Sequence, residues 1–218
     1  MRRAGLIASV ICVLASPAYG QTPPAPPKPI TDIGAAESKT WSFFASAYTF
    51  VVPDAPDYVQ PVFTADRERL HLEARYNYEA QRTGSLWIGY QFSGGHAVEW
   101  ELTPIAGVIF GDLTGGAPGY KGSLIWRRLE LYSESEYVID GRDTSQSFLY
   151  NWSELTVAPG EAVKIGLVVQ RTHAYQTDRD IQRGIIVGYV YRRAELTACF
   201  FNPDEDHPVF AFSVGFRF

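Results

Sequence analysis

A two-residue alternation of apolar and polar side chains recurs along most of this chain, and it restricts the fold more than any other feature. Segment 69–79, RLHLEARYNYE, places apolar side chains at every second position and charged or polar ones between them. Segments 85–92, 98–104, 162–170 and 184–193 repeat the pattern, with turn-rich breaks between them. Successive side chains of a β-strand point to opposite faces, whereas a helix repeats every 3.6 residues. The pattern therefore predicts an all-β fold of about ten antiparallel strands, or eight if one hairpin is misread.

The first twenty residues have the features of a secretory signal. Arg2 and Arg3 precede the apolar run 4–15, and Ala18 and Gly20 form a small-x-small cleavage pattern. We therefore expect residues 1–20 to be a signal peptide that is cleaved before Gln21.

Charge and cysteine content exclude several classes of protein. The formal net charge is −5 for the whole chain and becomes −7 once Arg2 and Arg3 leave with the signal. An acidic chain is poorly suited to nucleic acid, so no nucleic-acid partner is expected. Cys12 also leaves, so Cys199 is the remaining cysteine of the mature chain and no disulfide framework can form.

The last eleven residues, PVFAFSVGFRF, carry the strictest alternation. Its apolar members and the terminal residue are Phe210, Phe212, Val214, Phe216 and Phe218. This ending resembles the C-terminal strand of bacterial outer-membrane β-barrel proteins, although it points to no subfamily. The resemblance implies a closed transmembrane barrel with a lipid-facing apolar surface, a polar lumen, and recognition of the last strand by the barrel assembly machinery. Closure leaves no unpaired backbone edge in lipid.

The resemblance divides the chain into three parts and assigns its breaks to two sides of a membrane. We expect a signal peptide (1–20), a Pro-rich disordered periplasmic lead (21–38) and an outer-membrane barrel (39–218). Both ends of the barrel would then be periplasmic. The expected outer connections are 53–66, 93–96, 140–146, 172–180 and 202–207, and the expected periplasmic turns are 81–84, 111–119, 158–161 and 192–195.

Charged side chains on the polar faces form a candidate lumen cluster. The functional interpretation is a charged pore lining or an internal ligand site, and the alternative is an ion-pair network that fills a narrow lumen. The members are Arg69, His71, Glu73, Arg75, Glu79, Glu99, Glu101, Arg128 and Glu130.

Catalytic chemistry has weak support. Asp206 and His207, with Asp54 and Asp57 of the first outer connection, resemble only loosely the rim site of omptin-type barrel proteases, because Asp206 and His207 are adjacent in the chain. The four histidines show no metal-binding spacing, and no metal or other cofactor is expected.

The sequence therefore predicts a non-enzymatic outer-membrane barrel that is either a narrow porin-like channel or a structural, surface-interacting barrel. Its expected partners are outer-membrane lipids and the assembly machinery. The alternatives are a rim hydrolase that uses Asp206 and His207, and a soluble secreted β-barrel that binds an apolar ligand. Oligomeric state, transported solute, and the role of the Gly-rich segment 111–122 stay open at this point.

Overall fold

The structure is a computed structural model that describes residues 40–51, 56–174, 180–206 and 208–218. The predicted signal peptide and Pro-rich lead lie outside these described residues. The strands and one short helix are β1 (Ser42–Val51), β2 (Tyr58–Arg67), β3 (Leu70–Tyr76), β4 (Thr83–Tyr90), β5 (Phe92–Gly95), β6 (Glu99–Gly111), β7 (Gly115–Trp126), β8 (Leu129–Asp140), η1 (Thr144–Gln146), β9 (Phe148–Val157), β10 (Val163–Ala174), β11 (Asp180–Tyr191), β12 (Ala194–Phe201) and β13 (Val209–Arg217).

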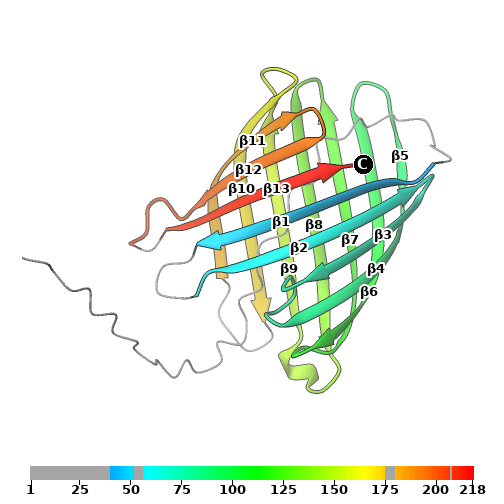
Figure 1. Cartoon of the computed structure of the whole chain (residues 1–218), viewed down its shortest axis with the longest axis vertical. Helices are drawn as coiled ribbons and strands as arrows, with labels where there is room; N and C mark the ends of the chain where they lie inside the picture. The colour runs from blue at the N-terminus through cyan, green and yellow to red at the C-terminus, as the bar shows by residue number, and fades with distance from the viewer. Residues whose placement is uncertain (1–39, 52–55, 175–179, 207) are drawn as a thin grey trace, which may run out of the picture.

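Antiparallel pairing closes these strands into a barrel. Neighbours follow the order β4-β3-β2-β1-β13-β12-β11-β10-β9-β8-β7-β6-β5, and β4 also pairs with β6. Figure 1 shows β13, in red, lying beside β1, in blue, at the seam where the last and first strands of the barrel pair. Both β4 and β5 pair with β6, and β5 continues the line of β4. The barrel therefore has twelve strands, with β5 as one extra short strand. The predicted all-β closed barrel is confirmed, and the predicted count of about ten strands is wrong.

Two hairpins account for the missing strands. The turns Glu68–Arg69 and Arg127–Arg128 each contain two charged residues, and their first residues have φ of 53° and 56°. Gly, Asn or Asp usually occupies a turn position with positive φ. Neither of these turns contains such a residue, so the sequence does not indicate that the chain reverses there. The expected loop 53–66 therefore contains most of β2, and Arg127–Arg128 is a full reversal of the chain.

The first missed hairpin also inverts the predicted side of three connections. Strand alternation from the seam places the connections 77–82 and 112–114 at the far end of the barrel, away from Phe218. The sequence predicts periplasmic turns there, at 81–84 and 111–119. The connection 96–98 lies at the Phe218 end, whereas the sequence predicts an outer connection at 93–96. The second missed hairpin restores the parity, so later connections lie on the sides expected. The Gly-rich segment 111–122 supplies the β6–β7 turn and the first half of β7.

Pro104 on β6 interrupts the neighbouring strand that pairs with it. Pro104 lies within β6, and β6 continues through it. The break falls instead at Gln91, between β4 and β5. The pairs Gly89–Ile105 and Phe92–Leu102 on either side keep one register, so the missing N–H of proline removes pairing locally without shifting the strands.

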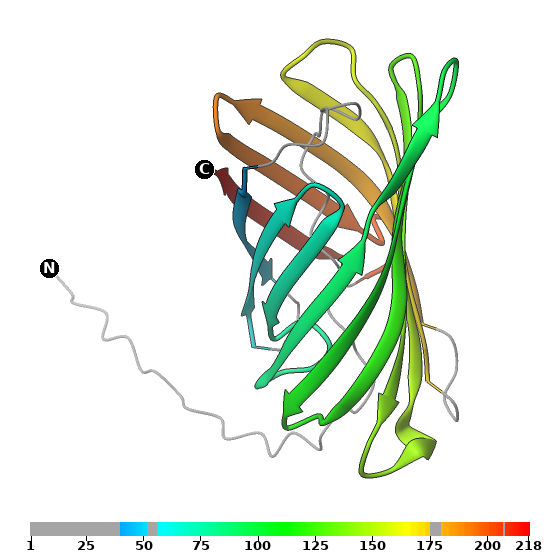
Figure 2. The ribbon, with the colours of Figure 1, turned by 90° about the vertical axis from the view of Figure 1, so that its right-hand side faces the viewer.

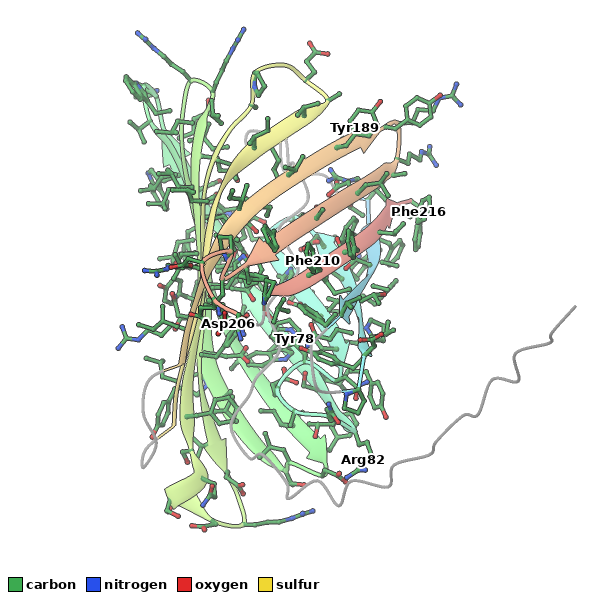
Figure 3. All side chains as sticks on the ribbon, turned by 90° about the vertical axis from the view of Figure 1, so that its left-hand side faces the viewer. Tyr78, Arg82, Tyr189, Asp206, Phe210 and Phe216 are labelled. Atoms are coloured by element: carbon green, nitrogen blue, oxygen red, sulfur yellow. The ribbon has the colours of Figure 1, made fainter. Side chains whose placement is uncertain are left out.

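The outer surface of the barrel is apolar around most of its circumference. The terminal series from Phe210 to Phe218 is 40–58% exposed, and exposed Leu, Ile, Val, Tyr and Trp side chains continue on other strands. Figure 3 shows Phe216 on β13 and Tyr189 on β11 pointing away from the interior. An apolar band of this extent suits lipid rather than water. Among the described residues, no helix is long and apolar enough to span a membrane.

The barrel has two walls that face one another across the lumen. Figure 2 shows the long strands β6 to β9 forming one wall, while β1, β2, β12 and β13 lie on the facing side. Side chains from both walls fill the space between them, and this lumen is where the charged residues gather.

Candidate functional site

The two-residue period of β3 directs its polar side chains into the lumen. His71, Glu73 and Arg75 are buried inside the barrel, while the intervening Leu72 and Ala74 face outward. The same alternation on the facing strands β7 and β8 brings a second set of charged side chains to meet them.

Arg75 lies at the centre of this site and is only 4% exposed. Its Nε donates to Glu73 Oε1 and its Nη1 donates to Glu136 Oε2, each at 2.8 Å. The guanidinium carbon lies 4.1 Å from the ring centroid of Tyr78 and 4.5 Å from that of Trp87. A planar guanidinium satisfies carboxylates along its edge and aromatic rings on its faces at once. Arg75 therefore ties β3 to β8 across the lumen.

Glu73 is shared by several cationic groups. Besides Arg75, it accepts from Lys121 Nζ at 2.5 Å and from His71 Nε2 at 3.2 Å. His71 Nδ1 in turn lies 2.6 Å from Asp66 Oδ1. Each nitrogen of this ring therefore faces a carboxylate oxygen.

The β3–β4 connection folds into the barrel and extends the network. Glu79 accepts from Ser85 Oγ at 2.7 Å, and Tyr78 donates its hydroxyl to Glu134. Tyr132 donates to the other oxygen of Glu134 at 2.5 Å. Figure 3 shows Tyr78 between the two walls. The cluster therefore joins one connection and the five strands β2, β3, β4, β7 and β8.

A second charged pair lies on the β9–β10 side of the lumen. Lys164 Nζ donates to Glu154 Oε2 at 3.2 Å, and Trp152 Nε1 donates to Glu154 Oε1 at 2.8 Å. The stem of Lys164 runs over Gly188, where an added Cβ would lie 2.6 Å from Lys164 Cγ. Glycine at this position therefore permits the close approach of the lysine. An adjoining cavity of about 10 Å³ has room for about one water molecule.

Apolar and aromatic side chains pack the far end of the lumen. Phe50 and Tyr58 stack with their ring centroids 4.9 Å apart, and Trp152 meets Phe201 edge to face at 5.7 Å. Phe50, Trp152, Phe201 and their neighbour Val138 have no exposed surface. These apolar side chains therefore occupy part of the lumen toward the end away from Phe218.

The structure brings together part of the charged cluster that the sequence predicted. His71, Glu73, Arg75 and Glu79 meet in the network above, and Glu101 lines the lumen elsewhere, where it accepts from Gln91 Nε2 at 2.7 Å. Glu130 lies on the lumen face of β8.

Three other predicted members lie away from the lumen network. Arg69 and Arg128 belong to the two-residue turns at the Phe218 end and are exposed, and Glu99 is exposed at the start of β6. The sequence pattern assigned Arg69 and Arg128 to strand interiors because it missed those turns, whereas Glu99 lies at the end of a strand that it did predict.

Four of the lumen residues that the sequence analysis did not list lie on strands whose limits were misjudged or whose polar face was not followed. They could have been found by extending the two-residue period along β7 to β10. They are Lys121, Glu136, Glu154 and Lys164.

Two of the four candidate catalytic residues, Asp57 and Asp206, lie in the described part of the chain. Asp57 and Asp206 are exposed, Asp206 on the β12–β13 connection marked in Figure 3. Asp54 and His207 lie outside the described residues. Within those described, no group of His, Cys, Asp or Glu is arranged to hold a metal ion.

Comparison with known proteins gives structural neighbours only. No protein-family model matches the chain, and no curated protein is significantly similar to it in sequence. The KdgM porin is similar in structure, with a TM-score of 0.62 and 9% identity over 80% of this chain and 99% of the porin. The KdgM porin in complex with disordered oligogalacturonate has a TM-score of 0.63, at the same identity and coverage.

The closed sheet, the apolar outer band and the charged lumen define the chain as a β-barrel of the bacterial outer-membrane type, with a porin-like architecture. The resemblance inferred from the final strand is therefore confirmed at the level of the fold.

Proposed function

We propose that this chain forms a narrow, non-enzymatic porin-like channel of the outer membrane that favours small cations over anions. The observation that carries the proposal is the excess of carboxylates on the lumen side. These are Asp66, Glu73, Glu79, Glu101, Glu130, Glu134, Glu136, Glu154 and Glu195, against the basic His71, Arg75, Lys121, Lys164 and Arg217.

An acidic lumen attracts cations and repels anions. Low-dielectric walls focus the field of such groups, and carboxylates are the usual lining of cation-selective pores. Glu79 Oε2 and Glu136 Oε1 are moreover buried with no hydrogen-bond partner among the described residues, so these oxygens have lone pairs that a cation in the lumen could use. One similar porin was solved with oligogalacturonate, whose sugar units bear carboxylates. The lumen of this chain opposes an anionic ligand, and we therefore propose small cations in its place.

We expect the reversal potential of the inserted protein to favour potassium over chloride. The measurement is a planar bilayer with a potassium chloride gradient across it. Glu101→Gln removes a lumen carboxylate and should move the reversal potential toward zero. Arg142→Gln, on the exposed β8–β9 connection, is the matched control and should leave it unchanged. Preference for chloride in the unsubstituted protein would contradict the proposal.

A closed structural barrel is the second candidate function. The apolar packing at the far end supports it, because Phe50 and Trp152 leave no exposed surface there. The same bilayer experiment separates the two candidates. Absence of conductance from protein shown to be folded and inserted would favour the structural barrel.

We further infer that residues 1–20 are removed during export and that the assembly machinery acts on the final strand. The charged start, apolar run and small-residue site at Ala18 and Gly20 support processing before Gln21. Protein purified from outer membranes should begin at Gln21 by N-terminal sequencing and have the corresponding intact mass. Retention of Met1 in membrane-inserted protein would be inconsistent with this inference.

A further inference from the structure

The apolar outer band contains one contiguous polar area, which we name the β8–β10 polar patch. It consists of Ser133 and Ser135 on β8, Asn151 and Ser153 on β9, and Arg171 on β10. These positions alternate with buried lumen residues and therefore point outward. Strand register places Ser133 opposite Ser153, and Asn151 opposite both Ser135 and Arg171. The patch is thus one continuous surface across three strands.

Apolar side chains surround this patch along the same strands. Leu131 and Tyr137 flank it on β8, Leu149 and Leu155 flank it on β9, and Val169 lies beside it on β10, all at least 36% exposed. Ser133 and Ser153 lie near the middle of their strands, where a barrel wall meets hydrocarbon. Lipid tails offer no hydrogen-bond partners, and an arginine on the lipid face costs up to about 2–4 kcal/mol at mid-depth. A lipid-exposed patch would therefore be unfavourable.

Internal hydrogen bonds hold the patch in one arrangement without using its full capacity. The Oγ atoms of Ser133 and Ser153 lie 3.1 Å apart, and Asn151 Nδ2 donates to the backbone oxygen of Glu134 at 3.0 Å. Arg171 Nε is buried with no hydrogen-bond partner among the described residues. Ser133 Oγ also contacts Asn151 Nδ2 and Tyr120 Oη, and Ser153 Oγ donates to Asn151 Oδ1, so the patch offers Arg171 Nε as its open donor.

A groove in the outer surface borders the patch. It has a volume of about 280 Å³, and its walls include Trp100, Leu102, Leu124 and Leu131. The groove passes Gly122, which pairs with Ser133 of the patch and contributes no side chain. A polar surface and an adjoining hollow therefore occupy the same wall of the barrel.

We propose that the β8–β10 polar patch and this groove form an interface with a second copy of the chain. Serine and asparagine both donate and accept, so a surface made of them can pair with itself around a two-fold axis. With that axis along the membrane normal and passing through β8 and β9, the strand order places β10 of one copy opposite β7 of the other. Arg171 then faces the strand that carries the groove at Gly122. A second copy supplies the acceptors that an acyl chain lacks.

The first test is site-directed disulfide cross-linking in outer membranes, in a Cys199→Ala background that removes the buried native thiol. Ser153→Cys should give an oxidant-dependent species of twice the chain mass. Thr49→Cys, which lies outward on β1 and distant from the patch in the strand order, is the matched control and should stay monomeric. Absence of the Ser153→Cys dimer, or equal cross-linking of both variants, would overturn the proposal.

The second test measures the mass of the unsubstituted barrel in detergent by light scattering after size-exclusion chromatography. We expect a dimer, and we expect Asn151→Leu combined with Ser153→Ala to give a monomer. Thr49→Val should leave the dimer intact. Heat-modifiable migration in gels checks that each variant is folded. A monomer for the unsubstituted protein at every concentration, or a folded double variant that stays dimeric, would also overturn the proposal.

Discussion

Arg75→Met should lower the free energy of unfolding by about 3–5 kcal/mol, because it leaves buried carboxylates without their cation. Glu73 and Glu136 each lose a 2.8 Å bond from the guanidinium, and the faces of Tyr78 and Trp87 lose the group between them. Methionine fills much of the same volume, so the loss would reflect charge and hydrogen bonding rather than a cavity. A urea titration of the barrel refolded into lipid measures the effect.

Arg82→Met is the matched control for that variant. Arg82 Nη2 lies 2.6 Å from Asp112 Oδ2, but its side chain is 80% exposed. An exposed pair contributes about 0–1 kcal/mol, so this substitution should change stability little despite the short distance. Combining Arg75→Met with Glu136→Gln should recover part of the loss, since Arg75 is the cation paired with Glu136 and the second substitution removes the carboxylate charge left behind. Equal effects of Arg75→Met and Arg82→Met would refute the assigned role of Arg75.

Deletion of Phe218 should sharply reduce the amount of folded barrel in outer membranes. Backbone bonds run both ways between Phe218 and Phe43, each at 3.0 Å, and their ring centroids lie 6.1 Å apart. The deletion removes both bonds, each contributing about 0.5–1.5 kcal/mol, together with the aromatic contact at the seam. The heat-modifiable species in membrane fractions reports the folded amount.

Two substitutions separate the parts of this effect. Phe218→Tyr keeps the ring and the backbone bonds and should assemble normally. Phe218→Ala keeps the bonds and loses the ring, so it should fall between the deletion and the unsubstituted chain. Normal assembly of the deletion variant would show that the terminal residue is dispensable for closing the barrel.

The outward series from Phe210 to Phe218 was predictable because the strand period depends only on side-chain geometry. The strand count was not, since Glu68–Arg69 and Arg127–Arg128 reverse the chain without Gly, Pro or Asn. Tertiary pairing fixes the positive φ that these residues do not prefer on their own. Pro104 illustrates the same limit, because its effect appears at Gln91 on another strand.

The sequence predicts which charged side chains of one strand share the lumen face. It does not predict which strands bring their charged side chains into contact. His71, Glu73 and Arg75 follow from the period of β3 alone. Their partners Lys121 and Glu136 depend on which strands face one another across the lumen, which requires the correct number of strands between them. The inward fold of Glu79 comes from a connection, where no period applies.

The seam between β1 and β13 determines the order in which this barrel can form. Neighbouring hairpins close loops of a few residues, whereas the pair Phe44–Arg217 joins opposite ends of the sheet. Because the entropy cost of closing a loop rises with its length, the seam should close last and slowly. Until it closes, β1 and β13 both present unpaired edges to other chains. The lifetime of that open sheet, rather than the stability of the closed barrel, would then set how much exported protein is lost to aggregation.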